Sequence, residues 1–304
     1  MSVAAGATGA PVRTTPFPTW PVYTDADLDG IAGAVRAGVW AAADGPLKQQ
    51  FEARFAAFQD AAHAVAVTNG TVSLEIALAA LGVGAGDEVI VPPYTFLATA
   101  SAVLKMNALP VFADIDPTTY CLDPAAVEAA ISPRTKAIIV VHLGGHPADL
   151  DRLLAIKQRH GLALIEDAAH APDASVAGRM LGTWGLAGAF SFFSNKVLAC
   201  GEGGLVATDD DEVAALARSL RSQGMTSGTW SRHTGETHSY DAVGLGYNYR
   251  LDEPRAALLH SRLRRLGEGV ARRRELTRAY RAKLAEIDGL VVPYEDADVE
   301  CSTC

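Results

Sequence analysis

The 304-residue sequence has few cysteines, fewer basic than acidic residues and no long apolar run. Its formal net charge of −9 argues against nucleic acids or anionic membranes as partners. No apolar run approaches the roughly 20 residues that a membrane-spanning helix needs. The first ten residues, MSVAAGATGA, lack the basic start and the apolar core of a signal peptide. These absences predict a cytoplasmic protein that binds neither nucleic acid nor membrane.

The four cysteines do not form a recognisable metal site or disulfide framework. Cys121 and Cys200 are isolated in the sequence and are interpreted as buried thiols. Cys301 and Cys304 form a C-x-x-C at the end of the sequence, but a zinc site would need a second pair or suitably spaced histidines, and none follows. We therefore expect no bound metal.

From about Ala64 onward, short apolar runs alternate with segments of helical periodicity, which are expected at 72–81 and 95–104 after the first two runs. The apolar runs are HAVAVT (63–68), DEVIVP (87–92), LPVFADI (109–115), KAIIVV (136–141), LALIED (162–167), GAFSFF (188–193) and GGLVAT (203–208). Continuous runs bounded by turns are typical of strands that are buried on both faces. The sequence therefore predicts an α/β fold with a largely parallel central sheet flanked by helices.

Three regions are predicted along the chain. Residues 1–40 are proline-rich (TTPFPTWPV) and should form an arm and a first helix, whereas residues 41–253 form the large α/β domain. Residues 254–304 should contain a long helix to about Ile287 and the beginning of a small C-terminal domain, with LVVP (290–293) as its opening strand. Because so short a remainder cannot close a domain of its own, we expect this region to be truncated.

The segment TNGT (68–71) lies between a predicted strand and a predicted helix. Gly70 allows a tight turn, and the amides of Gly70 and Thr71 would point out of the helix N-terminus with the Thr71 hydroxyl beside them. Such an arrangement binds phosphate groups. The alternative is an ordinary strand–turn–helix connection with Asn or Thr as the N-cap.

The segment IEDAAH (165–170) places Asp167 at the end of a buried strand and His170 three residues later. One helical turn would bring both side chains beside the same ligand. A carboxylate in this position can keep a ring nitrogen protonated by pairing with it. The alternative is that Asp167 caps the next helix and His170 is a surface histidine.

The segment SFFSNKVLACGEGG (191–204) contains a single lysine, Lys196, between an apolar run and a glycine-rich turn. Lys196 is either a surface lysine or an amine that forms a Schiff base with an aldehyde, and Ser191 adds a hydroxyl nearby. In PPYTFLATA (92–100), Tyr94 and Phe96 follow a predicted strand, and one of the two rings could stack on a flat heterocycle; the alternative for each is packing in the core. Together with the phosphate cradle and the Asp167 carboxylate, these groups match one ligand, pyridoxal 5′-phosphate (PLP).

The sequence resembles the PLP-dependent sugar aminotransferases of the DegT/DnrJ/EryC1/StrS group, which have the aspartate aminotransferase fold (fold type I). The resemblance extends from about residue 16 to the end of the chain. The motifs that carry it are NGT (69–71), GDEVIVPPYTF (86–96), PRTKAIIVVHLGG (133–145), IEDAAHA (165–171), SFFSNK (191–196), GEGG (201–204) and GYNYRLDE (246–253).

The resemblance implies a role for each candidate residue. Lys196 would hold PLP covalently and shuttle a proton at the substrate carbon, and Asp167 would pair with the pyridine nitrogen. His170 would contact the phenolic oxygen, and Phe96 would stack on the ring. The phosphate would be bound by Gly70, Thr71 and Ser191, and by Asn248 of a neighbouring subunit. That last role requires a homodimer with shared active sites.

The implied reaction is a ping-pong transamination from glutamate or glutamine to a keto-sugar, typically linked to a nucleotide, in antibiotic or polysaccharide biosynthesis. Three alternatives remain open: an aminocyclitol (inosose) aminotransferase, an enzyme like aminohydroxybenzoate synthase, and a non-catalytic protein with this fold. In the segment 224–241, Trp230, His233, His238 and Tyr240 are candidates for reading the acceptor, or belong to a solvated loop.

Overall fold

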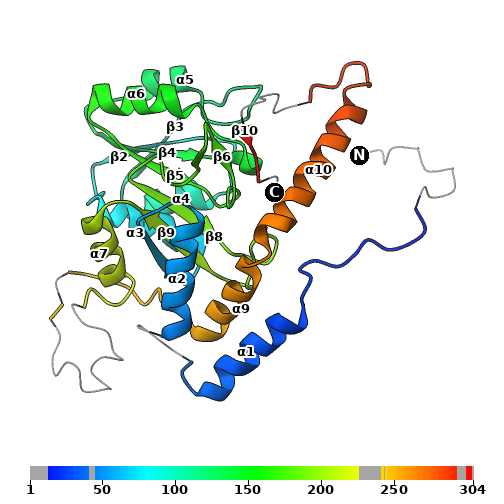
Figure 1. The fold of residues 1–304 in the computed structure, drawn as a ribbon. Coiled ribbons are helices and arrows are strands. Elements are labelled where there is room, and N and C mark those ends of the chain that lie inside the picture. Colours follow the sequence, from blue (N-terminus) through cyan, green and yellow to red (C-terminus); the bar gives the residue numbers. More distant parts are fainter. Residues whose placement is uncertain (1–12, 41–44, 226–240, 243, 293–298, 303–304) are drawn as a thin grey trace, which may run out of the picture.

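The computed structural model describes residues 13–40, 45–225, 241–242, 244–292 and 299–302. A seven-stranded sheet with the strand order β1-β9-β8-β5-β4-β2-β3 lies at its centre (Figure 1). The strands are β1 (His63–Val67), β2 (Glu88–Val91), β3 (Leu109–Phe112), β4 (Thr135–Val141), β5 (Ala163–Asp167), β8 (Ala187–Ser191) and β9 (Gly204–Thr208). The strands from β8 to β3 are parallel, and β9 is antiparallel to both of its neighbours. The predicted α/β fold with a largely parallel sheet is confirmed.

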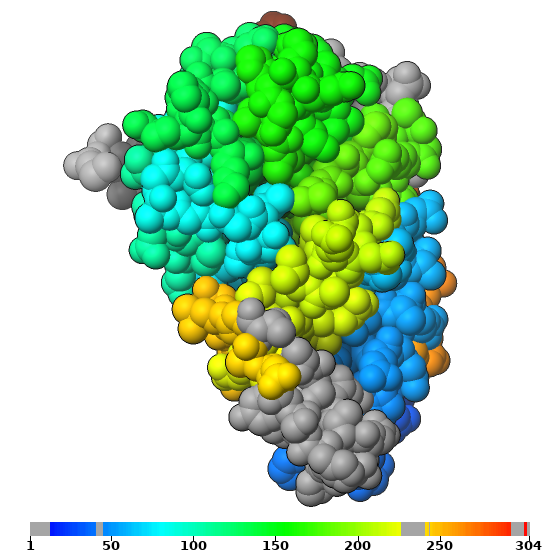
Figure 2. Space-filling model, turned by 90° about the vertical axis from the view of Figure 1, so that its left-hand side faces the viewer, coloured from blue at the N-terminus to red at the C-terminus, as the bar shows by residue number. Residues whose placement is uncertain are grey.

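Helices cover both faces of the sheet because successive strand residues alternate between two apolar cores. In β1, Ala64 and Ala66 belong to one core, and Val65 and Val67 belong to the other. The first core contains residues of α2 (Pro46–Phe58), α5 (Pro124–Ala130), α6 (Leu150–His160) and α9 (Glu253–Leu263). The second contains residues of α3 (Gly70–Ala80), α4 (Ala98–Lys105) and α7 (Asp211–Leu220). Figure 2 shows α7, in yellow-green, on the surface beside the blue α2.

The prediction that every strand is buried on both faces is wrong for β3. Leu109 is 53% exposed and Phe112 is 58% exposed. The reason is position, since β3 is the last strand of the sheet and pairs with β2 at the edge. An apolar run alone does not distinguish a central strand from an edge strand.

The C-terminal part differs from its prediction in two places. The expected single helix is divided into α9 and α10 (Leu266–Leu284), and the chain turns between them where Arg265 binds the buried Asp27 of α1 (Asp25–Ala37) at 2.5 Å. Residues 290–292 of the expected opening strand are not in a strand, and Val291 is 73% exposed. The division of the chain into three regions stays a prediction.

A short second sheet forms from segments that are distant in sequence. Its strands are β10 (Val299–Glu300), β6 (Ser175–Val176) and β7 (Arg179–Met180). This second sheet lies close to the main sheet, whereas α10 projects away from the main sheet (Figure 1). In the part of the chain that the structure describes, no helix combines the length and the apolar character that crossing a bilayer requires.

Candidate active site

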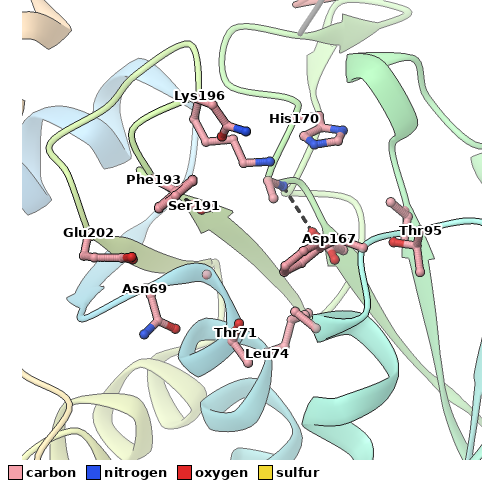
Figure 3. Close-up of a pocket in the computed structure, with 16 residues that line it drawn as sticks. Asn69, Thr71, Leu74, Thr95, Asp167, His170, Ser191, Phe193, Lys196 and Glu202 are labelled. Carbon is pink, nitrogen blue, oxygen red and sulfur yellow. Dashed lines mark hydrogen bonds between the residues drawn. The ribbon is translucent and has the colours of Figure 1, made fainter. Parts of the chain in front are cut away.

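A cavity of about 370 Å³ opens at the carboxyl ends of β4, β5 and β8. In open parallel sheets this edge is where ligands bind. The lining includes seven of the predicted site residues, namely Gly70, Thr71, Phe96, Asp167, His170, Ser191 and Lys196. Figure 3 shows the side chain of Lys196 extending towards His170 and Asp167, with Asn69 and Thr71 across the cavity. The fold therefore brings together residues that are up to 126 positions apart in the sequence, from Gly70 to Lys196.

The N-terminus of α3 forms one wall of the cavity. Asn69 caps this helix by accepting the Val72 N–H at 2.9 Å, and Gly70 and Thr71 follow as the first helical residues. A Cβ atom on Gly70 would lie 2.7 Å from the Cβ of Ser191, so only glycine lets the helix approach β8 this closely. Asn69 is therefore the N-cap that one interpretation of TNGT expects. Gly70 and Thr71 line the cavity, and the binding of a phosphate group by their amides stays a prediction.

Asp167 ends β5 and is only 8% exposed. Its carboxylate accepts hydrogen bonds from the Thr99 hydroxyl at 2.9 Å and from the Ala169 N–H at 3.2 Å, and Figure 3 marks the second of these with a dashed line. Burial raises the pKa of Asp167, although these donors and the nearby charges of Lys196 and His142 act in the opposite direction. A cationic ligand group placed against this carboxylate would relieve the cost of burying its charge.

The predicted helical turn after Asp167 is wrong. The Ala171 N–H donates to the Ala168 carbonyl at 2.9 Å in a turn, and no helix begins there. Asp167 is therefore not a helix cap, because its side chain bonds the Ala169 amide within the turn. The turn still places His170 on the cavity wall.

His170 is held in one tautomer. Its Nδ1 accepts the Gly144 N–H at 3.2 Å, which leaves the proton on Nε2 as a donor. Burial, together with the positive charge of Lys196, lowers the pKa of His170 to about 4. At neutral pH the ring is therefore uncharged and can donate one hydrogen bond to an oxygen atom of a ligand.

Lys196 and Phe96 reach the cavity from loops. Lys196 is half-buried in the connection between β8 and β9, and its backbone N–H donates to the Phe193 carbonyl at 2.8 Å. Phe96 is 76% exposed, so it is not the core residue that was the alternative interpretation. Its ring is accessible to a flat ligand in the cavity.

Sequence reasoning missed Thr95 and Thr99. The two hydroxyls lie 2.9 Å apart, and the Thr99 hydroxyl binds Asp167, so they extend the hydrogen-bond network of the carboxylate. The spacing of four residues in TFLAT would place two threonines on one side of a helical turn, which is the signal that could have found them.

Sequence reasoning also missed the fully buried pair Glu166 and His142 behind Asp167. Glu166 accepts the His142 Nε2–H at 2.9 Å and the N–H groups of Gly182, Trp184 and Gly185 at 2.7, 2.6 and 2.7 Å. The His142 N–H in turn donates to the Asp167 carbonyl at 3.2 Å. This network fixes the end of β5 against the loop before β8. A glutamate inside an apolar run gave no sign of its partners.

Asn248 is the one predicted site residue that does not line the described cavity. It is exposed and forms an antiparallel bridge with Ser222. Its expected role at the active site of a neighbouring subunit therefore stays a prediction. The candidates Trp230, His233, His238 and Tyr240, as well as Cys304, lie outside the described residues.

The residues of the cavity fit PLP. The closely packed helix N-terminus at Gly70 and the Ser191 hydroxyl suit a phosphate group. The buried Asp167 suits a protonated ring nitrogen, and the neutral His170 suits an oxygen atom that accepts a hydrogen bond. The Lys196 amine supplies the group that binds an aldehyde.

Comparison with known proteins agrees with this chemistry. The model of the DegT/DnrJ/EryC1/StrS aminotransferase family matches residues 23–303. The spore coat polysaccharide biosynthesis protein SpsC of Bacillus subtilis is 45% identical over 84% of this chain and 66% of its own length. The L-glutamine:2-deoxy-scyllo-inosose aminotransferase of Streptomyces kanamyceticus is 44% identical over 92% of this chain and 67% of its own length. The chain thus spans about two thirds of the length of these curated relatives.

Solved structures share the fold. 3-Amino-5-hydroxybenzoic acid (AHBA) synthase superposes with a TM-score of 0.89 at 39% identity, covering 96% of this chain and 74% of that one. The putative sugar aminotransferase Spr1654 of Streptococcus pneumoniae, in its PLP form, has a TM-score of 0.86 at 26% identity, covering 96% and 76%. PLP is the cofactor of this group of proteins, and the cavity described above suits it. The chain belongs to the DegT/DnrJ/EryC1/StrS aminotransferase family.

Proposed function

We propose that this protein is a PLP-dependent aminotransferase that moves an amino group from glutamine or glutamate to a ketone carbon of a sugar or cyclitol. The observation that carries the proposal is that Lys196, Asp167 and the Gly70–Thr71 helix terminus line one cavity. Bound PLP supplies an electron sink that allows an amino group to be exchanged at carbon. The protein supplies position, charge and proton transfer.

Each residue has a task in this proposal. The Lys196 amine holds the cofactor and then takes and returns a proton at the substrate carbon. The Asp167 carboxylate keeps the ring nitrogen protonated, and the network of Thr99 and Ala169 fixes its direction. The neutral His170 donates its Nε2–H to an oxygen of the cofactor. The phosphate is held by Gly70, Thr71 and Ser191, and Phe96 covers the ring.

We further propose a homodimer in which Asn248 completes the phosphate site of its partner. Asn248 is exposed, while its neighbour Tyr249 is tied to the strand before the cradle, because the Tyr249 carbonyl accepts the Thr68 N–H at 3.0 Å. An exposed amide on a segment fixed in this way is suited to contact a second copy across an isologous interface. The oligomeric state in solution, measured by light scattering, tests this part directly.

The acceptor is proposed to be a cyclic polyhydroxylated ketone. The similarity to an inosose aminotransferase favours a cyclitol acceptor and glutamine as donor. The similarity to a spore coat polysaccharide protein and to a putative sugar aminotransferase favours a keto-sugar, including one linked to a nucleotide. The likeness to AHBA synthase makes an aromatic precursor the third candidate. The setting would be antibiotic or polysaccharide biosynthesis.

The test begins with the protein loaded with PLP. Reduction with borohydride followed by peptide mapping should label Lys196, and Lys196→Gln should abolish the label. The matched control is Lys283→Gln, which changes an exposed lysine of α10 and should leave the label intact. A label on another lysine of the folded wild-type protein contradicts the assignment.

The second stage asks whether the amino group moves. Addition of glutamine or glutamate should convert the absorption of the bound cofactor to that of pyridoxamine phosphate in a single half-reaction, as a ping-pong mechanism requires. A panel of inososes, nucleotide-linked keto-sugars and aromatic precursors should then restore the original spectrum with one class of acceptor. Cofactor binding without any spectral change would favour a non-catalytic member of the family.

A further inference from the structure

The loop that carries Lys196, residues 192–203, is fixed unevenly by its own packing. After Lys196, the side chains of Val197, Leu198, Ala199 and Cys200 are all at most 8% exposed. Before it, Phe193 and Asn195 are exposed and Ser194 is half-buried. The apolar core therefore holds the half of the loop that follows the lysine. In the half that precedes it, Phe192 is also buried and the Ser194 hydroxyl donates to the Gly201 carbonyl at 3.3 Å, so residues 193–195 are the part that the core itself does not hold.

Trp20 of the N-terminal arm contacts the half that precedes the lysine. Its indole Nε1–H donates to the Ser194 carbonyl at 3.0 Å, two residues before Lys196. The ring is itself held by two guanidinium groups, since Arg273 lies 5.0 Å and Arg262 lies 5.8 Å from its centroid. Trp20 belongs to the motif PFPTWPVY, to which the proposed reaction gives no task.

Arg262 of α9 connects the arm to the other half of the loop. Its side chain is buried, and it donates to the Ala199 carbonyl at 2.9 Å and to the Val22 carbonyl at 3.2 Å. One guanidinium thus binds the loop three residues after Lys196 and the arm two residues after Trp20. Burying a cation is costly unless its donors find acceptors, and here one backbone carbonyl of each segment accepts a hydrogen bond from the guanidinium.

We propose that Trp20 is a positioning residue for Lys196, with Arg262 holding the arm in place. The inference rests on the proposed function of Lys196 as the lysine that binds PLP. The indole N–H fixes the backbone just before the lysine, on the side that the core leaves open, and Arg262 fixes the backbone just after it. The arm therefore determines how the amine reaches into the cavity, although Trp20 itself does not line the cavity.

The chain offers a matched pair of tryptophans for the test. Trp40 also donates its indole N–H to a backbone carbonyl at 3.0 Å and is similarly exposed, but its acceptor is Val35 of α1. Trp20→Phe and Trp40→Phe each keep an aromatic ring and lose one such bond. Only the first loses a bond to the loop of Lys196.

Two rates are measured on each variant, with thermal unfolding as a check on the fold. The first is the rate of trace acetylation of Lys196 in the protein without PLP. Mass spectrometry gives it as the ratio of acetylated Lys196 to acetylated Lys283, which is exposed. Because a lost hydrogen bond shifts a local equilibrium by about three- to tenfold, Trp20→Phe should raise this ratio by about that factor. The second is the rate at which PLP attaches to Lys196, which should fall in the same variant. Trp40→Phe should leave both rates at wild-type values.

The outcomes separate this inference from the proposed function. Wild-type protein that never attaches PLP at Lys196 contradicts the proposed function, and the acetylation ratio still decides the role of Trp20. A folded Trp20→Phe protein with the wild-type ratio and attachment rate overturns the positioning role, as does an equal change in Trp40→Phe. If Trp20→Phe does not fold, Arg262→Lys replaces it, because lysine lacks the two separate guanidinium nitrogens that reach the two carbonyls. It should change both rates in the same directions, and unchanged rates would again overturn the proposal.

Discussion

Replacing Gly70 by alanine adds one methyl group at a closely packed point of the proposed phosphate site. The new Cβ would stand 2.7 Å from the Cβ and 3.3 Å from the Cα of Ser191. Ordinary contacts between carbon atoms are about 3.5–4.0 Å, so α3 and β8 would have to separate by roughly 1 Å. Forcing an extra methyl group into a well-packed site costs about 1–3 kcal/mol. The same displacement moves the helix amides away from the position they hold for a phosphate.

Two measurements follow the consequence of Gly70→Ala. Urea unfolding of the protein without PLP should show a loss of about 1–3 kcal/mol in the free energy of unfolding. Titration with PLP, followed by absorbance, should show weaker binding by about 10-fold or more, since 1.4 kcal/mol corresponds to a factor of ten.

The matched control is Gly33→Ala in α1. A Cβ at Gly33 would meet nothing within 4 Å, so this change should stabilise the helix by about 0.5–1 kcal/mol and leave PLP binding unchanged. The double variant Gly70→Ala with Ser191→Gly removes the clashing Cβ but also the hydroxyl. It should recover stability without recovering affinity. Wild-type affinity in the folded Gly70→Ala single variant would refute the phosphate-site argument.

Three further outcomes are expected. Without PLP, burial holds the pKa of Asp167 above its value in the unfolded chain, so the folded state binds more protons and stability falls as pH rises through the carboxyl range. Asp167→Asn removes this loss, and urea unfolding should show its stability relative to wild type increasing as the pH rises above the ordinary carboxyl pKa of about 4. The pKa of His170 is lowered to about 4, so stability falls as pH drops from about 6.5 to about 4, and NMR titration of the ring should give a midpoint near 4 rather than 6.5. Glu166→Gln turns an amide NH₂ towards N–H donors and should lower the free energy of unfolding by about 3 kcal/mol, whereas the exposed Glu268→Gln should change it by less than about 0.5 kcal/mol.

The sequence predicted the cavity from local signals. Asp167 ends one apolar run, Ser191 lies near the end of a second, and Gly70 follows a third, so the rule that ligands bind at the carboxyl ends of the strands of a parallel sheet was enough to place them together. The same reasoning failed after Asp167, where the three-residue spacing to His170 suggested a helix. The structure uses a turn instead, because the Asp167 carboxylate bonds the Ala169 amide directly.

What the sequence did not predict depends on contacts between distant segments. The bonds of Glu166 to the amides of residues 182–185 and the bond of Trp20 to Ser194 join segments 16 to 174 positions apart. No periodicity marks either contact. In the sequence, a buried glutamate cannot be told from a surface glutamate, and a tryptophan that bonds a distant loop cannot be told from one that packs in a core. Their hydrogen-bond partners can be identified only from the three-dimensional structure.

The glycines of GEGG (201–204) illustrate how the two kinds of information combine. The motif contributed to the family resemblance, but its letters alone indicated no physical role for the last two glycines. A Cβ on Gly204 would lie 2.2 Å from the Asn69 carbonyl oxygen and 2.8 Å from the Gly70 nitrogen, and one on Gly203 would lie 2.7 Å from the Cys200 sulfur. Gly204 therefore packs directly against the turn that is proposed to bind phosphate, while Gly203 packs against the loop of Lys196. The turn at Gly70 and the loop at Lys196 are thus packed against adjacent residues, so a substitution at either glycine should disturb cofactor binding from outside the cavity.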